Sequence, residues 1–171
     1  MHADESYRRE GKGEEMAQMA PDAGVVGTGA PFERYAEVQQ FYAWQMGLLD
    51  DGAADEWADT FTEDAIFDEP SLAAPLLGRE AIRESVRARV ARLAAEGVTI
   101  RHWFNMITVE PMADGELRAR SYALTLSTAP GADLTVRGHA ICLDLLVPHG
   151  SGWLVRHRQI RPDNRAAAPT R

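Results

Sequence analysis

The hydrophobic period of this chain changes at Gly97. Before Gly97 the apolar residues recur every three or four positions, which is the spacing of one helical face. After Gly97 they recur about every second position, which is the spacing of a strand with one buried face. The sequence therefore predicts helices in the first half and strands in the second, an α+β plan.

Three helices are predicted before Gly97. The first begins near Pro31, a residue favoured in a first helical turn, and ends before Gly52. A short second helix includes Phe61 on its apolar side, a strand starts at residues 65–67, and a third helix covers residues 79–96. The buried stripe of the first helix is predicted to comprise Tyr35, Val38, Tyr42, Met46 and Leu49, widened by Phe41, Trp44 and Leu48. This width suggests that the helix is covered on more than one side.

Four strands are predicted in the second half, near residues 98–110, 115–128, 133–148 and 152–162. The breaks between them are short enough for antiparallel hairpins. To bury both the first and the third helix, the sheet has to curl around them. We therefore predict a curved antiparallel sheet wrapped round three N-terminal helices, which forms a cone with one pocket at its wide end.

Composition limits the number of domains and the class of partner. The 171 residues suit one domain, predicted over residues 31–164, with a disordered leader at 1–30 and a flexible tail at 165–171. A net charge of −8 disfavours nucleic acid and anionic membranes as partners. Cys142 is the only cysteine, so neither an intramolecular disulfide nor a cysteine zinc cage is possible. No apolar run approaches the ~20 residues of a membrane helix, and the N-terminus has no secretory signal core, so a cytoplasmic location is predicted.

His102 is the first candidate for chemistry. Strict alternation places His102, Phe104 and Met106 on one face of the 98–110 strand, with Trp103 on the other. A titratable imidazole among apolar neighbours is typical of a pocket wall, where it can accept or donate protons near neutral pH. The alternative is a structural histidine that binds a backbone group or lies on the rim.

A carboxylate lies where the first helix ends. Either Asp50 or Asp51 could point inward, and Asp50 is preferred because it follows Leu49 on the buried stripe. The alternative is a solvated turn, since Asp-Asp-Gly is a common turn composition. An aspartate and an imidazole that face one apolar cavity would suffice to move protons on carbon.

Several segments resemble a known superfamily. These are residues 41–67, the helix start Leu77-Gly78-Arg79-Glu80-Ala81-Ile82, the strand Arg101-His102-Trp103 and the strand Gly152-Trp153-Leu154-Val155. Over about residues 32–163 the chain resembles the nuclear transport factor 2-like α+β cone, and within it the SnoaL-like branch. The resemblance implies a small bacterial tailoring enzyme of aromatic polyketide and antibiotic biosynthesis, a lyase, cyclase or isomerase that works by acid–base chemistry without a metal or cofactor.

The resemblance also implies roles for four residues. His102 matches the catalytic histidine of scytalone-dehydratase-like and bile-acid-dehydratase-like relatives, and Asp50 matches the aspartate that orients it. Glu69, just before Pro70, lies where ketosteroid-isomerase-like relatives have their general base; the alternative is a solvated loop carboxylate. Tyr42 would donate to an enolate oxygen, unless it is simply part of the core.

Other residues are candidates for substrate contact. Phe104 and Met106 would line the pocket. Trp103 and Tyr122 would shape a slot for flat rings, unless they are simply part of the core. Arg158, predicted to share a strand face with Arg156, would meet an acidic or phenolate substrate; the alternative is that these arginines are simply solvated. His139 is interpreted as a core histidine, although its small neighbours leave room for a ligand. No two histidines have the i, i+2 or i, i+4 spacing of metal ligands, so no metal site is predicted.

Three functions follow as hypotheses. The first is a cofactor-independent cyclase or dehydratase in which His102 is the acid–base group for a small hydrophobic aromatic or polycyclic substrate. The second is a ketosteroid-isomerase-like proton shuttle that uses Glu69. The third is a non-catalytic binding module or accessory subunit. In each case the resemblance implies a homodimer that pairs through the outer face of the sheet.

Overall fold

The computed structural model describes residues 30–163, so residues 1–29 of the predicted leader and the predicted 165–171 tail lie outside the described residues. Three α-helices and a short 3₁₀ turn are present in that range: α2 (Phe32–Asp50), α3 (Ala54–Asp59), α4 (Arg79–Ala95) and η1 (Ala113–Gly115). The strands are β1 (Phe61–Asp68), β2 (Leu76–Leu77), β3 (Thr99–Pro111), β4 (Leu117–Thr128), β5 (Thr135–His149) and β6 (Gly152–Pro162). The predicted change from helices to long strands near Gly97 is confirmed.

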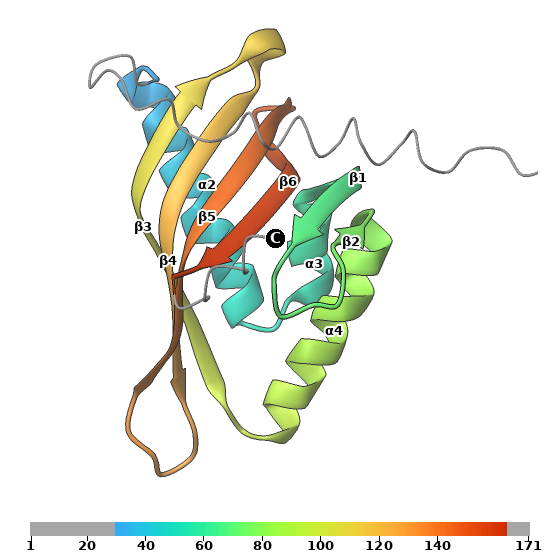
Figure 1. Cartoon of the computed structure of the whole chain (residues 1–171), viewed down its shortest axis with the longest axis vertical. Helices are drawn as coiled ribbons and strands as arrows, with labels where there is room; N and C mark the ends of the chain where they lie inside the picture. Colours follow the sequence, from blue (N-terminus) through green and yellow to red (C-terminus); the bar gives the residue numbers. More distant parts are fainter. Residues whose placement is uncertain (1–29, 164–171) are drawn as a thin grey trace, which may run out of the picture.

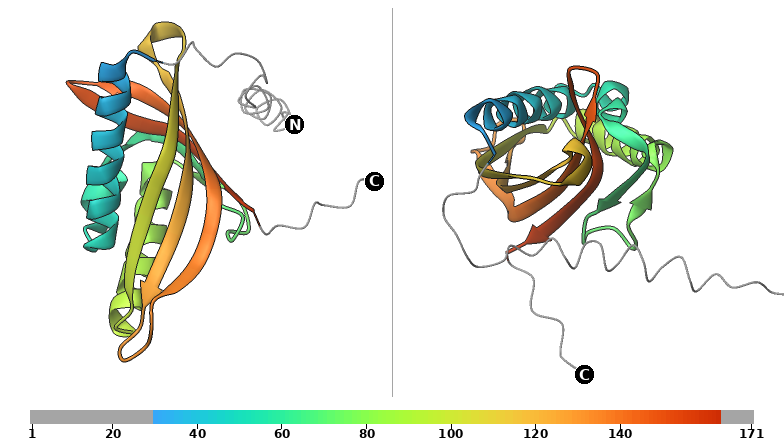
Figure 2. Two further views of the ribbon diagram at one scale, coloured as in Figure 1. Left: turned by 90° about the vertical axis from the view of Figure 1, so that its left-hand side faces the viewer. Right: turned by 90° about the horizontal axis from the view of Figure 1, so that it is seen from above.

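The six strands form one curved sheet in the order β2-β1-β6-β5-β4-β3. The helices lie on one side of it, and the sheet does not close into a barrel (Figures 1 and 2). The predicted α+β fold is confirmed, but the sheet is mixed rather than wholly antiparallel. The reason is that β1 pairs in parallel with β6, while β3, β4, β5 and β6 form the expected antiparallel meander.

The second helix is shorter than predicted. It ends at Asp59, and Phe61 begins β1 instead of extending the apolar side of α3. Phe61 pairs with Val155 of β6 and is fully buried. Its spacing from Trp57 fits a helix, but pairing with a strand from the far end of the chain determines its conformation, as tertiary context often does.

Helix α2 packs against the sheet through one main face. Val38, Tyr42 and Met46 are buried as predicted. Tyr35 and Trp44 are exposed, so the predicted stripe is wrong at Tyr35 and the helix is not covered on the side of Trp44. Since α2 packs on one side of the sheet and has its other face to solvent, a single buried stripe is sufficient.

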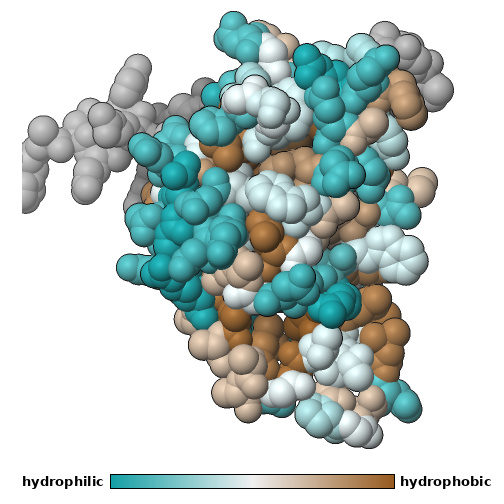
Figure 3. Space-filling model, turned by 180° about the vertical axis from the view of Figure 1, so that it is seen from behind, coloured by the Kyte–Doolittle hydropathy of each residue, from teal (hydrophilic) through white to brown (hydrophobic). Residues whose placement is uncertain are grey.

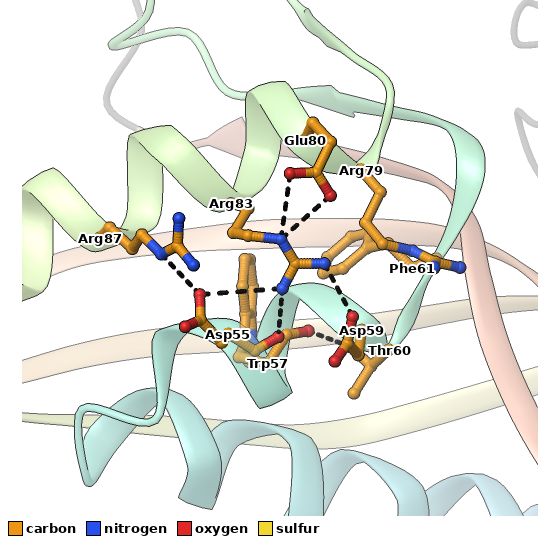
Figure 4. Close-up of polar contacts among 9 residues, drawn as sticks. All are labelled: Asp55, Trp57, Asp59, Thr60, Phe61, Arg79, Glu80, Arg83 and Arg87. Carbon is orange, nitrogen blue, oxygen red and sulfur yellow. Dashed lines mark hydrogen bonds and ion pairs between the residues drawn. The ribbon is translucent and has the colours of Figure 1, made fainter.

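An arginine cluster fixes α4 to α3 and β1 (Figure 4). Arg83 donates to the backbone oxygen of Asp55 at 2.9 Å and to a carboxylate oxygen of Asp59 at 2.7 Å. Arg87 donates to the carboxylate of Asp55 at 2.6 Å, and this hydrogen bond holds the pKa of Asp55 below its ordinary value. Arg79 donates to the backbone oxygen of Phe61 at 2.7 Å. These bonds fix α4 in a position where its apolar face meets the concave side of the sheet.

The surface view from behind shows hydrophobic residues between hydrophilic flanks, mostly in the lower half of the molecule (Figure 3). Isolated exposed apolar residues are ordinary for a globular protein.

Within residues 30–163 no helix combines the length and apolar character needed to cross a bilayer.

Candidate active site

A cavity of about 320 Å³ lies between the helices and the concave face of the sheet. Its volume falls in the range of about 300–1,000 Å³ typical of small-molecule sites. Most of the wall is apolar and includes Trp57 of α3, Phe67 of β1, Ile82 of α4 and Phe104 of β3. The polar side chains on the wall are Glu69, Ser85, Arg89, His102, Thr125, Arg137, His139 and Arg158. An apolar slot with a few converging polar groups is the usual form of a substrate site.

Asp50 and His102 form a close pair at the cavity wall. The Nδ1 atom of His102 lies 2.6 Å from Oδ1 of Asp50, and the backbone N–H of His102 donates to Oδ2 at 3.0 Å. The Asp50 and His102 side chains are 9% and 11% exposed, respectively. Two contacts to one carboxylate, removed from most solvent, fix the orientation of the imidazole ring. Asp51, the alternative considered from the sequence, is exposed.

The chain places Asp50 here despite an unfavourable helix position. Asp50 is the last residue of α2, where the negative end of the helix dipole disfavours a carboxylate by about 0.3–1 kcal/mol. Gly52, with φ of +80°, turns the chain directly afterwards toward α3. The two contacts from His102 compensate for the dipole. The backbone N–H is available for one of them because β3 is an edge strand with free backbone groups.

This geometry determines which nitrogen of His102 is available for chemistry. An ionised carboxylate only accepts hydrogen bonds, so Nδ1 bears the proton and Nε2 keeps its lone pair in the neutral ring. Among residues 30–163, Nε2 has no hydrogen-bond partner. Since His102 lines the cavity, Nε2 can serve as a general base there, and Asp50 stabilises the imidazolium that forms.

Tyr42 lies beside the cavity rather than on its wall. Its hydroxyl donates to Oδ2 of Asp144 at 2.7 Å, and its ring contacts Phe104 edge-on at 5.5 Å between centroids. Burial and the nearby Asp144 carboxylate raise the pKa of Tyr42 well above its ordinary value. The structure therefore does not bring this hydroxyl to the cavity, as the predicted enolate donor would require; it supports Asp144 and Phe104 instead.

Arg158 is the largest fully buried side chain of the described residues, and it does line the cavity. It donates from Nε and Nη2 to the carboxylate of Asp144, with a shortest distance of 2.6 Å, and from Nη2 to Oε1 of Gln45 at 2.8 Å. Burial alone would lower the pKa of Arg158, but the Asp144 charge outweighs it and the pKa lies above its ordinary value. The guanidinium is therefore permanently cationic. Gln45 in turn donates to Thr60, which completes a network across α2, β5 and β6.

The sequence analysis missed Asp144, and it wrongly placed Arg156 and Arg158 on the same face of their strand. A β-bulge in β6 shifts the register, since Leu146 pairs with Val155 while Leu145 pairs with His157. Arg156 therefore has a different environment from Arg158 and pairs with Glu116 at 2.6 Å. The signal for Asp144 was present: a single acid inside the apolar run 140–147 requires a buried partner.

A second bulge determines which β3 residues face the cavity. The register shifts between Asn105 and Thr108, and Met106 has φ of +53°. His102 and Phe104 line the cavity, but Met106 is exposed because the bulge reverses the alternation, and Ile107 becomes buried instead. The expectation that Met106 shares the face of His102 is therefore wrong.

Two further aromatic candidates are also away from the cavity. Trp103 and Tyr122 are exposed and are not among the residues that line it, and the guanidinium of Arg120 covers the Tyr122 ring at 4.8 Å. The structure thus does not bring them together with His102 as walls of a slot. They lie on the sheet face opposite to the cavity, where the expected homodimer would pair; that pairing stays a prediction.

Glu69 follows β1 directly and lines the cavity. It therefore lines the same cavity as His102, and it remains a second candidate base.

His139 is not the core histidine that the sequence favoured. Its side chain is 53% exposed, lines the cavity, and lies 2.8 Å through Nδ1 from Oδ2 of Asp163. The backbone N–H of Asp163 also donates to the His139 oxygen at 3.3 Å. The pairing joins β5 to the residue after β6, a contact between distant positions that no local pattern indicates. Across residues 30–163 no cluster of three or more His, Cys, Asp or Glu could hold a metal ion.

Comparison with solved structures finds close matches over most of the chain. Aln2 from a Streptomyces species is 34% identical, covering 79% of this chain and 94% of that one with a TM-score of 0.73. ActVI-ORFA from Streptomyces coelicolor is 28% identical, covering 80% and 100% with a TM-score of 0.73. A protein from Catenulispora acidiphila, solved in complex with S-DNPA, is 37% identical, covering 78% and 96% with a TM-score of 0.69. No curated protein matches.

Fold and cavity together define an α+β protein of the nuclear transport factor 2-like class, with a carboxylate–imidazole pair at its pocket. The model of the SnoaL-like domain matches residues 31–159, and the chain belongs to that family. The predicted family is therefore confirmed. Membership supports a role of the polyketide cyclase or dehydratase kind, without specifying the reaction.

Proposed function

We propose that this protein is a cofactor-independent acid–base enzyme, a cyclase or dehydratase that acts on an aromatic polyketide-like substrate. The single observation that best supports this is the buried Asp50–His102 pair at the wall of an apolar cavity. Family membership supports the same class of reaction.

The reaction begins when Nε2 of His102 removes a proton from a carbon next to a carbonyl. The C–H electron pair forms the C=C bond of an enolate, and the carbonyl π pair moves onto oxygen. In a dehydration, an oxygen lone pair of the enolate re-forms the carbonyl and the enolate C=C pair becomes the new double bond to the next carbon. The C–O bond on that carbon breaks as Nε2–H protonates the departing hydroxyl, which leaves as water. In a cyclisation, the enolate carbon attacks a second carbonyl, and the proton passes to the alkoxide that results.

The surroundings of the pair favour such steps. Asp50 keeps the imidazole in the tautomer that presents a lone pair, and stabilises the imidazolium between the two proton transfers. Apolar walls such as Phe67, Ile82 and Phe104 exclude water, which strengthens the remaining electrostatic contacts. Proton transfer of this kind contributes about 10²–10⁴-fold, and the rest of the rate has to come from positioning of the substrate.

A hydrogen-exchange assay tests the first step without the natural substrate. Bicyclic aromatic ketones such as tetralones would be incubated with the protein in D₂O, and loss of the α-proton signal followed by NMR. The wild type should exchange the α-proton faster than buffer, and His102→Ala should lower the protein-dependent rate about 10²–10⁴-fold. His149→Ala removes an exposed histidine at the end of β5 and serves as the matched control.

The Glu69 shuttle is the second candidate, because the structure places Glu69 on the cavity wall. In that case Glu69→Gln abolishes exchange while His102→Ala retains the full rate. A wild type that binds the ketones but exchanges no faster than buffer would contradict both enzyme hypotheses and favour the non-catalytic binding module.

A further inference from the structure

Arg158 has unused hydrogen-bonding capacity. A guanidinium has five N–H groups. The Nε–H and one Nη2–H bind Asp144, and the other Nη2–H binds Gln45. This leaves the two N–H groups of Nη1, which have no hydrogen-bond partner within residues 30–163.

The packing around the guanidinium shows where Nη1 has room. Aromatic rings surround its central carbon, with ring centres at 5.4 Å for Phe104, 5.6 Å for Phe61 and 5.8 Å for Tyr42. Asp144 and Gln45 occupy the edge formed by Nε and Nη2. Arg158 is only 1% exposed but is one of the residues that line the cavity, so a small part of its side chain borders that space. Nη1 is the nitrogen with hydrogen-bonding capacity left, so it is the group of Arg158 that a ligand in the cavity can engage.

We propose that Nη1 of Arg158 is an oxyanion-binding site, which holds the enolate or phenolate oxygen of an aromatic ligand in the cavity. This assignment rests on the proposed function for its role in the reaction. It replaces Tyr42, the donor expected from the sequence, whose hydroxyl already serves Asp144.

The placement of Phe104 relates the oxyanion site to the base. His102 and Phe104 are alternate residues on the same face of β3, and the guanidinium lies against the Phe104 ring. A flat substrate lying over Phe104 therefore has His102 near one end and Arg158 near the other. Proton removal at the first end develops negative charge on oxygen at the second, where a fixed cation in an apolar site stabilises it.

The buried ion pair makes this donor preorganised. Asp144 is fully buried and receives hydrogen bonds from both Arg158 and Tyr42, so the guanidinium has no other rotamer available without breaking several bonds. Donors held in place before reaction need no reorganisation when charge develops, which is the main source of electrostatic catalysis.

Substituted 2-naphthols test the site directly, because their absorption and fluorescence distinguish the neutral naphthol from the naphtholate. The wild type should bind the naphtholate at least about tenfold more tightly than the neutral form, which lowers the pKa of the bound naphthol by about one unit or more. Arg158→Lys keeps a cation beside Asp144 but has no Nη1, and should lose this preference.

Two variants address folding and the source of the charge. The double variant Arg158→Leu with Asp144→Leu removes the buried pair together, which proteins often tolerate, and should also lose the preference. Arg156→Met, on the same strand but paired with Glu116, should keep it.

The outcomes separate this proposal from the function on which it rests. A wild type that does not favour the naphtholate, or an Arg158→Lys variant that favours it equally, overturns the oxyanion site even where His102-dependent exchange persists. Conversely, a naphtholate preference that depends on Arg158 in a protein without α-proton exchange supports the site and contradicts the proton-transfer function.

Discussion

Two histidine–aspartate pairs border the same cavity and differ mainly in burial. His102 and Asp50 lie 2.6 Å apart and are 11% and 9% exposed. His139 and Asp163 lie 2.8 Å apart but are 53% and 48% exposed. The first pair also includes a backbone N–H that donates to the carboxylate, whereas in the second the aspartate N–H donates to a histidine carbonyl.

This difference indicates that the distance between an imidazole and a carboxylate does not by itself determine how much their contact contributes. Water screens the exposed pair, and its side chains lose entropy when they associate, so the contact contributes little. Removal from solvent strengthens the buried contact and makes its loss costly. The fully buried pair of Asp144 and Arg158 is the third and most buried of these carboxylate contacts.

The largest effect is expected for the fully buried pair, Asp144 and Arg158. Asp144→Asn removes the only carboxylate that binds Arg158 within the described residues and leaves an uncompensated cation, so the free energy of unfolding should fall by about 3–5 kcal/mol. Urea unfolding measures this loss. A loss below about 1 kcal/mol, the scale of an exposed ion pair, would show that burial does not determine the size of the effect.

The second prediction separates the two histidines by activity. His102→Ala should lower α-proton exchange by about 10²–10⁴-fold, whereas His139→Ala should change it by less than about tenfold, because His139 is solvated and has no buried carboxylate to orient it. The assay is deuterium uptake by bicyclic ketones. Equal losses in both variants would mean that both imidazoles take part in proton transfer.

The third prediction separates the two aspartates by stability. Asp50→Ala leaves the ring and backbone N–H of His102 without an acceptor and should cost about 1–3 kcal/mol. Asp163→Ala should cost less than about 1 kcal/mol, since its partner stays hydrated. Chemical denaturation of the two variants side by side provides the measurement, and a reversed order would contradict the role given to burial.

The fourth prediction uses pH to examine the fully buried cluster. Burial, followed by the Asp144 charge, raises the pKa of Cys142 and of Tyr42 above their ordinary values of 9.0 and 10.0. Above those values the unfolded chain loses protons that the folded chain retains, so stability falls as pH rises, by up to about 1.4 kcal/mol per pH unit for each group.

Cys142→Ala isolates one of these two groups. Unfolding would be measured between about pH 8 and about pH 11, a range that spans both ordinary values. The variant should begin to lose stability about one pH unit later than the wild type, because of these two groups only Tyr42 is then left to lose its proton in the unfolded chain while keeping it in the folded one. Identical pH profiles would show that the thiol titrates in the folded protein as it does in the unfolded chain.

The smallest expected effect is spectroscopic. The Nδ1–H proton of His102, held by a buried carboxylate, should exchange slowly enough with water to give an NMR signal near neutral pH, and Asp50→Asn should remove it. The Nδ1–H of His139 should give no such signal, and added salt should weaken only the exposed pair. A protected signal from His139 would contradict the conclusion that burial distinguishes the two histidine–aspartate pairs.

The sequence was sufficient where periodicity alone determines structure. The change of period at Gly97 predicted the long strands, and the place of Asp50 after Leu49 favoured Asp50 over Asp51 as the inward carboxylate. Both inferences depend on local spacing, which one chain displays in full. The contact of Asp50 with His102 was implied by the family resemblance instead.

The two bulges were not predictable in the same way. An extra residue near Met106 and another near Arg156 reverse the alternation, so Met106 leaves the cavity and Arg156 separates from Arg158. The partners Asp144 and Asp163 were also missed. Asp144 meets Arg158 because β5 pairs with β6, and Asp163 meets His139 because the chain returns past β5 after β6. Such contacts depend on register, which hydrophobic spacing does not specify once a bulge occurs.

The parallel pairing of β1 with β6 has a consequence for how the chain is assembled. Ile66 pairs with His157, so the sheet joins two segments that lie far apart along the chain. Contacts between such distant positions slow folding, because a long loop has to close before they form. Until β6 arrives, Asp144 has no arginine and the cavity has no wall at Arg158. The nascent chain can thus form the contact between Asp50 and His102 before β6 is available, whereas Arg158 meets Asp144 only after β6 has joined the sheet.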